Sequence, residues 1–116
     1  KPDVAMANAV QCADMKGAYE LAAANFTRAL KLAPDNASLA LRFAESRYRQ
    51  QRYEDARQLL ERASKLAQPS AESLWLGLRV ERKLGDAVQE AAYGRQLRRL
   101  FPDSEAARRL EAGDYE

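Results

Sequence analysis

The chain repeats itself every 34 residues. Residues 17–35, GAYELAAANFTRALKLAPD, set a glycine, a tyrosine, a phenylalanine and a proline among alanines. One period later, Tyr53, Ala56, Leu60 and Ala63 occupy the equivalent places. A period of roughly 20–50 residues is typical of repeat architectures, in which each supersecondary unit packs on the next. The period therefore constrains the fold more than any single motif does.

Composition and spacing both favour helix. The chain has 116 residues, 47% hydrophobic and 31% charged, which suits one compact folded domain. It is rich in alanine, leucine, arginine and glutamate, whereas isoleucine is absent and there is a single threonine. Apolar residues at spacings of three and four predict helices at about 3–15, 19–32, 36–49, 53–67, 71–84, 87–101 and 104–112.

The gaps between these helices are short, so neighbouring helices are expected to run antiparallel. Gly17 and Gly85 fall in turns inside the predicted hairpins, where glycine adopts a left-handed backbone at little cost. Gln51 takes that place in the middle repeat and makes a less favourable turn. The candidate N-caps are Asp35 or Asn36, Ser70, and Asp103 or Ser104.

The small residues of the period have a physical purpose. Two helices pack closely only where small side chains lie at their crossing and large ones lie beside it. We expect Ala22 and Ala56 at the crossings inside two hairpins, and Ala29 and Ala63 where the next repeat approaches. The residues expected to fill the flanking space are Tyr19, Phe26, Tyr53 and Leu60.

The pattern G-x-Y-x-x-A-x-x-x-F-x-x-A-x-x-x-x-P, which starts at Gly17, resembles the tetratricopeptide repeat. The third copy departs from it, with Glu90 in place of alanine and Gly94 in place of the aromatic residue. The resemblance implies an all-α fold of helical hairpins stacked in a right-handed superhelix. It implies one domain, 1–116, with repeats at about 3–36, 37–70 and 71–104 and a capping helix at 104–112.

Several kinds of chemistry lack the residues they need. There is no histidine, which removes the usual general base and every histidine-containing metal set. No glycine-rich phosphate-binding motif occurs. The lone Cys12 is either a buried or a reactive thiol, and the net charge of only +2 gives no bulk attraction to nucleic acid. We therefore predict a protein that is not an enzyme, has no cofactor or metal, and does not bind nucleic acid.

In a stack of such hairpins, the first helix of each pair lines the concave surface. Aromatic and arginine side chains there are typical of protein interfaces. Trp75 could equally pack in the core, and of the lysine–asparagine clamp used by chaperone-binding modules only Asn8 is suggestive. The residues predicted to line the groove are Ala7, Asn8, Gln11, Leu41, Arg42, Glu45, Tyr48, Arg49, Trp75, Arg79 and Arg82.

A second resemblance lies toward the C-terminus. Residues 71–104 contain the runs S-L-x-L-G-x-R from Ser73 and A-x-Y-G-x-Q-L-x-R-L-F-P from Ala91. This segment is similar to the last repeat of the PilF/PilW-type pilotin lipoproteins of Gram-negative type IV pili. Gly94 belongs to that family's version of the repeat, which accounts for the departure in the third copy.

The second resemblance implies a binding scaffold that helps the pilus secretin reach the outer membrane and assemble there. Its place would be the periplasmic face of that membrane, with membrane contact only through a lipid anchor absent from this chain. The alternative is a generic tetratricopeptide adaptor in the cytoplasm that binds another protein or peptide. We interpret the chain as a C-terminal fragment of a longer protein, and self-association through an apolar end at residues 1–15 is expected.

Overall fold

Between residues 4 and 116, the computed structural model forms six α-helices and no strand. The structure describes the backbone of residues 4–116 and the side chains of residues 16–116. The predicted all-α fold is confirmed, and no helix in this part is long and apolar enough to cross a membrane. The helices are α1 (Val4–Leu32), α2 (Ala37–Arg49), α3 (Tyr53–Leu66), α4 (Ala71–Leu84), α5 (Ala87–Leu100) and α6 (Glu105–Ala112).

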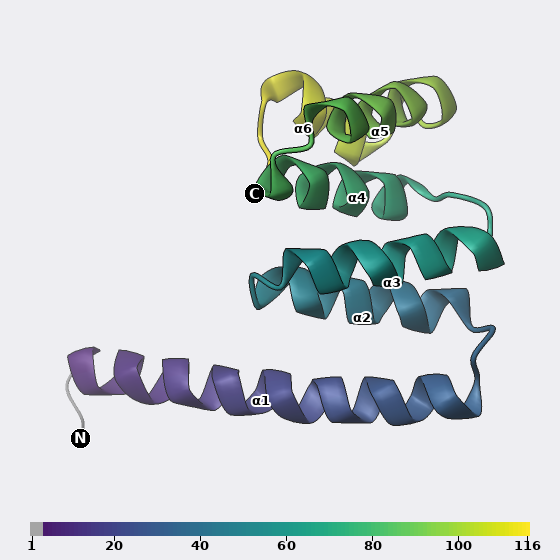
Figure 1. Ribbon diagram of the computed structural model, residues 1–116. Helices are drawn as coiled ribbons and strands as arrows, with labels where there is room; N and C mark the ends of the chain where they lie inside the picture. Colours follow the sequence, from purple (N-terminus) through teal and green to yellow (C-terminus); the bar gives the residue numbers. More distant parts are fainter. Residues whose placement is uncertain (1–3) are drawn as a thin grey trace.

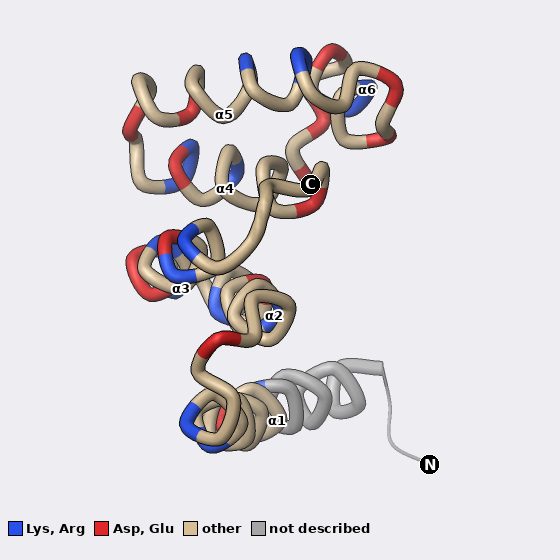
Figure 2. The backbone as a smooth tube through the Cα atoms, turned by 90° about the vertical axis from the view of Figure 1, so that its right-hand side faces the viewer, with Lys and Arg blue, Asp and Glu red and all other residues tan. Residues whose placement is uncertain are grey.

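The helices stack in chain order, from α1 at one end to α5 and α6 at the other (Figure 1). Two hairpins form, α2 with α3 and α4 with α5, and α3 packs on α4. Figure 2 looks nearly along α1, α2 and α3, whereas α4 and α5 lie across the view, so the helix axes rotate along the stack. The short α6 contacts both α4 and α5 and takes the predicted capping place.

Side-chain caps fix where four helices begin. The predicted caps Asn36, Ser70 and Ser104 each accept the backbone N–H of the residue three positions on. Asp86 caps α5 in the same way. Each such bond satisfies a donor that the helix start leaves free and contributes about 1 kcal/mol. The starts of α2, α4, α5 and α6 are therefore encoded locally, whereas α3 begins after Arg52 without a side-chain cap.

The turn predicted at Gly17 is wrong. α1 runs through Gly17 without a break and joins the predicted helices 3–15 and 19–32 into one helix of 29 residues. One glycine costs a helix only about 1 kcal/mol relative to alanine, and Lys16 and Ala18 beside it favour helix. Nothing lies within 4 Å of where a Gly17 side chain would begin, so no tertiary contact requires a bend there.

The other two predicted turns form. Gly85 ends α4 with φ +80°, and Gln51 follows α2 with φ +63°. A left-handed backbone costs a residue with a side chain about 1–2 kcal/mol, but glycine almost nothing. The turn between α2 and α3 is therefore strained at Gln51, as its position in the repeat suggested.

Gln51→Gly is expected to stabilise the protein by about 0.5–1 kcal/mol, because the relief of backbone strain exceeds the added freedom of the unfolded chain. Urea unfolding measures this change. Gln50→Gly is the matched control, since Gln50 has φ −82° and should lose stability. Equal losses for the two variants would contradict the assignment of strain to Gln51.

Small residues lie at the crossing inside the α2–α3 hairpin, as predicted. Ala44 on α2 and Ala56 on α3 have no exposed surface, and Leu60 packs in the same cluster. Ala63, which was predicted to face the next repeat, is buried further along α3 in a cluster with residues of α1 and α2. The absence of bulky side chains at these points lets the two helix backbones approach closely.

On α1 the buried residues differ from the prediction. Ala22 and Ala29 are only half-buried, whereas Ala23 and Leu30 are buried. The reason is the missing turn: α1 does not fold back on itself, so the face with Ala23 and Leu30 packs against α2 instead. Phe26 completes this contact, with its ring stacked 5.1 Å from the ring of Phe43.

The α4–α5 hairpin reverses the size pattern of the hairpin before it. Thirty-four residues apart, Phe43 corresponds to Gly77 and Leu59 to Tyr93, so the large ring moves from the first helix to the second. A Cβ at Gly77 would lie 2.5 Å from Cζ of Tyr93, so the ring occupies the space a side chain would need. The third copy of the repeat lacks the alanine expected at its helix crossing, and Gly77 and Tyr93 make the crossing instead.

Gly77→Ala is expected to destabilise the protein by about 1–2 kcal/mol, because the displaced Tyr93 ring costs more than the gain in helix propensity. Gly94→Ala on α5 is the control: its Cβ would meet Leu78 and Leu110 at 3.6 Å, an ordinary contact, so stability should rise slightly. Tyr93→Leu should remove most of the penalty of Gly77→Ala. Urea unfolding of the three variants checks this, and a Gly77→Ala protein as stable as the parent would contradict it.

One buried ion pair joins the two hairpins. Glu81 on α4 is 4% exposed, and Arg57 on α3 donates two hydrogen bonds to it, with Nε 3.0 Å from Oε2. The hydrogen bonds from Arg57 to Glu81 raise the pKa of the guanidinium above its ordinary value. Arg57 also reaches Glu54 at 3.2 Å and Asp86 at 3.9 Å, nearer the surface. The pair fixes how α4 sits on α3.

Glu81→Gln is expected to cost about 1–3 kcal/mol, because it removes the charge that compensates a partly buried guanidinium. Glu54→Gln, which touches the same arginine from an exposed position, should cost only a few tenths. A double-mutant cycle with Arg57→Met, measured by urea unfolding, should give a coupling energy for Arg57 and Glu81 well above that for Arg57 and Glu54. Equal coupling would show that the buried pair has no special role.

Candidate functional site: an aromatic and cationic face on α4

The predicted groove residues fall on α2 and α4 where they are described. The side chains of Ala7, Asn8, Gln11 and Cys12 lie outside the described residues. Arg42, Glu45 and Arg49 are exposed on α2, and Arg49 pairs with Glu45 at 2.7 Å. Both members of that pair are at least half exposed, so the pair adds little stability. This part of α2 is a free charged surface.

The aromatic residues predicted for the groove are not free. Tyr48 is 8% exposed and Trp75 is 7% exposed, so each packs against other parts of the chain. Arg79 joins them: its guanidinium carbon lies 4.6 Å from the ring centroid of Tyr48 and 6.0 Å from that of Trp75. The structure thus brings Tyr48, Trp75 and Arg79 together across α2 and α4, as the spacing predicted, but under cover.

The cover comes from a residue that the sequence analysis missed. After α6 the chain turns at Gly113, whose φ is +71°, and Tyr115 returns to α4. The Tyr115 ring stacks on Trp75 with centroids 6.0 Å apart and planes 17° from parallel. The guanidinium carbon of Arg82 lies 3.9 Å from the centroid of the Tyr115 ring. In the sequence, this contact is signalled only by an aromatic residue that lies just beyond a glycine in a polar segment.

Polar contacts hold the same segment. Arg79 Nε donates a hydrogen bond of 2.7 Å to the backbone oxygen of Tyr115. Lys83 Nζ lies 3.7 Å from a carboxylate oxygen of Glu116. We call Trp75, Arg79, Arg82 and Lys83 the α4 face; the four residues lie on one side of α4 and contact Tyr115 or Glu116.

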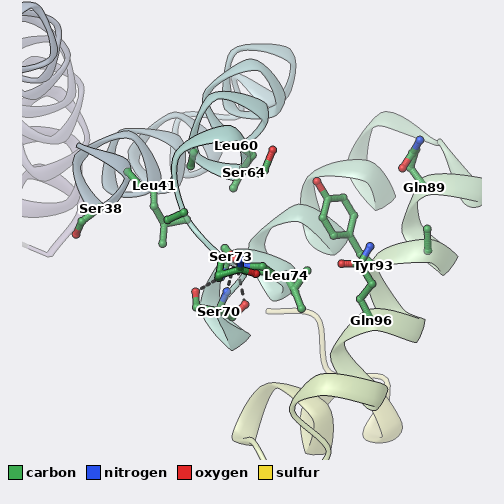
Figure 3. A pocket seen from close by; sticks show the side chains of 16 residues that line it. Ser38, Leu41, Leu60, Ser64, Ser70, Ser73, Leu74, Gln89, Tyr93 and Gln96 are labelled. Carbon is green, nitrogen blue, oxygen red and sulfur yellow. Dashed lines mark hydrogen bonds between the residues drawn. The ribbon is translucent and has the colours of Figure 1, made fainter. Parts of the chain in front are cut away.

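A separate cleft of about 530 Å³ opens between the two hairpins. Figure 3 shows Leu60 on one side, Tyr93 on the other and Leu74 between them. Burial raises the pKa of the Tyr93 phenol, so this residue stays neutral well above neutral pH. The lining is uncharged and consists of Ala37, Ser38, Leu41, Leu60, Ala63, Ser64, Ala67, Gln68, Pro69, Ser70, Ser73, Leu74, Gln89, Ala92, Tyr93 and Gln96.

The described residues offer no constellation for a metal: nowhere do three or more His, Cys, Asp or Glu side chains gather in a suitable arrangement. The conspicuous features of the described surface are exposed arginines, partly covered aromatic rings and the uncharged cleft. These are groups that bind other polypeptides.

Comparison with known proteins supports this interpretation. The tetratricopeptide repeat family matches residues 15–79. The type IV pilus assembly protein PilF of Pseudomonas aeruginosa is 35% identical over 79 residues, which are 68% of this chain and 31% of PilF.

Two solved structures are similar over most of the chain. One, from the functional characterization of Pseudomonas aeruginosa PilF, has a TM-score of 0.72 and 31% identity over 90% of this chain and 45% of that one. The other, of PilW, described as a widely conserved type IV pilus biogenesis factor, has a TM-score of 0.77 and 26% identity over 86% and 46%. The chain spans less than half the length of these relatives. With its stacked helical hairpins and its 34-residue period, the chain belongs to the tetratricopeptide repeat family.

Proposed function

We propose that this chain is part of a protein scaffold for type IV pilus biogenesis that assists localisation and assembly of the outer-membrane secretin. The observation that carries the proposal is the similarity to PilF, a type IV pilus assembly protein, over 68% of the chain. The similarity to PilW, a pilus biogenesis factor, supports it independently at the level of structure.

The surfaces fit a protein partner better than a small substrate. α2 presents Arg42 and Arg49 to solvent, and arginine is favoured at interfaces because its rigid fork pairs with carboxylates. The uncharged cleft between the hairpins can take apolar side chains beside them. A charged rim next to an apolar recess is the usual anatomy of a protein interface.

The proposal places the parent protein at the periplasmic face of the outer membrane, held there by a lipid anchor outside this chain. The partner is the folded secretin subunit, and neither a cofactor nor nucleic acid takes part. A generic adaptor that binds some other protein or peptide in the cytoplasm is the competing explanation. Binding to the secretin separates the two.

Replacing Arg42 and Arg49 on α2 by glutamate should weaken secretin binding by the full-length parent protein about tenfold, because charge reversal at an interface rim slows association. The matched control reverses Arg95 and Arg99, which are exposed on α5, and should leave binding unchanged. Surface plasmon resonance with purified, folded secretin from the same organism measures the affinity, and far-ultraviolet circular dichroism checks that helicity is kept.

No detectable affinity between the unaltered parent protein and the folded secretin would refute the proposed function. Binding that survives the α2 reversal but is lost in the α5 control would instead move the interface to the second hairpin, on α5. A fall in helicity that parallels the fall in affinity would mark the α2 arginines as structural.

A further inference from the structure

We propose that the α4 face is a binding site for a peptide in which an aromatic residue is followed by an acidic one. The chain's own residues 114–116 occupy this site and compete with such a peptide. The inference rests on the proposed function only in that the ligand is a protein segment. It identifies the segment by the chemistry of the face.

Each part of the occupying segment meets a matching group. The Tyr115 ring meets the indole of Trp75 and the guanidinium of Arg82. The backbone oxygen of Tyr115 accepts a hydrogen bond from Arg79, and the Glu116 carboxylate faces Lys83. Separate side chains within three turns of α4 thus contact the Tyr115 ring, the backbone carbonyl of Tyr115 and the carboxylate of Glu116.

Most of the receptor groups have partners in the repeat stack as well as in the segment. Arg79 lies over Tyr48 of α2, and the guanidinium carbon of Arg109 on α6 lies 5.9 Å from the Trp75 ring centroid. Trp75 and Leu78 are buried in the core cluster that α4 shares with α5 and α6. Tyr115 packs against the same cluster. When the segment leaves, Arg79 and Arg109 keep these partners, and Arg82 keeps Glu90.

The charges of the face point to an acidic ligand. The guanidinium groups of Arg79, Arg82 and Arg109 lie beside the rings of Trp75 and Tyr115, and a fourth cation, Lys83, lies beside the Glu116 carboxylate. Two carboxylates that pair with them come from the occupying segment: Asp114 pairs with Arg109 at 3.4 Å, and Glu116 with Lys83 at 3.7 Å. Of these four cations, as far as the structure describes the chain, only Arg82 pairs with a carboxylate on a helix, that of Glu90 at 3.2 Å. Release of the segment leaves an aromatic surface with excess positive charge.

The segment is suited to exchange. It follows a glycine turn, its two ion pairs are largely solvent-exposed, and Tyr115 is the one ring that anchors it. Exposed ion pairs add little to binding. A tethered segment of this kind acts at an effective concentration on the order of millimolar, so a partner peptide must outcompete it. Removing the anchor ring should therefore raise the apparent affinity for an added peptide.

Trp75 is the only tryptophan of the chain, so its fluorescence reports on this face directly. Within the described residues its indole N–H has no hydrogen-bond acceptor, so stacking and packing set its environment. The probe is a peptide with the sequence of residues 112–116, acetylated and amidated so that its ends carry no charge. It is titrated into the 116-residue chain, either unaltered or carrying Tyr115→Ala.

The Tyr115→Ala chain should bind the peptide at least tenfold more tightly than the unaltered chain. A peptide with alanine for tyrosine should not bind, and one with glutamine for glutamate should bind severalfold more weakly. Arg82→Gln in the Tyr115→Ala background should lower the affinity at least fivefold, whereas Arg99→Gln on α5 should not change it. Circular dichroism checks that each variant keeps its helices.

Two outcomes would overturn the proposal. One is no fluorescence change in the Tyr115→Ala chain up to millimolar peptide. The other is equal affinity for the tyrosine and alanine peptides. The assay contains no secretin, so its failure leaves the proposed function standing. A failure of secretin binding, conversely, would not affect the peptide result.

Discussion

The approach of two helix backbones at a crossing without bulky side chains is the constraint on which the rest of the structure depends. In the α2–α3 hairpin the crossing is made by Ala44 and Ala56, neither of which has exposed surface. In the α4–α5 hairpin it is made by Gly77, with the ring of Tyr93 laid across it. The two solutions differ in chemistry, and each packs the two helices of a hairpin against one another, which with the contact of α3 on α4 places α4 and its polar face on the stack.

Much of the fold could be predicted because it depends on local signals. Apolar spacing and side-chain caps act over a few residues, and together with the 34-residue period they located every helix from α2 to α6. The failure at Gly17 shows the limit of such signals. One internal glycine costs a helix only about 1 kcal/mol, and nothing packs beside Gly17 to require a bend, so α1 stays one helix and packs on α2. The 34-residue period alone does not predict whether the helix bends at this glycine.

The site was predictable to the same extent. The repeat pattern put Tyr48, Trp75, Arg79 and Arg82 on the first helices of two repeats, and the structure brings Tyr48, Trp75 and Arg79 together. Helical spacing could not show that another segment of the chain covers these residues. Tyr115 reaches Trp75 across forty positions of sequence, through a turn whose direction is set by Gly113 after α6. The Arg57–Glu81 pair was missed for the same reason, since its members belong to different repeats.

That ion pair bears on how freely the repeats of this chain could be exchanged. One period earlier, Ala23 stands in the place of Arg57 and Arg47 in the place of Glu81, and the α1–α2 junction is made of stacked rings instead. Each junction is thus stabilised by a different interaction. A hairpin moved to another position in the stack would leave a charge without its partner or a gap in the packing. The repeats are therefore similar in sequence but cannot replace one another.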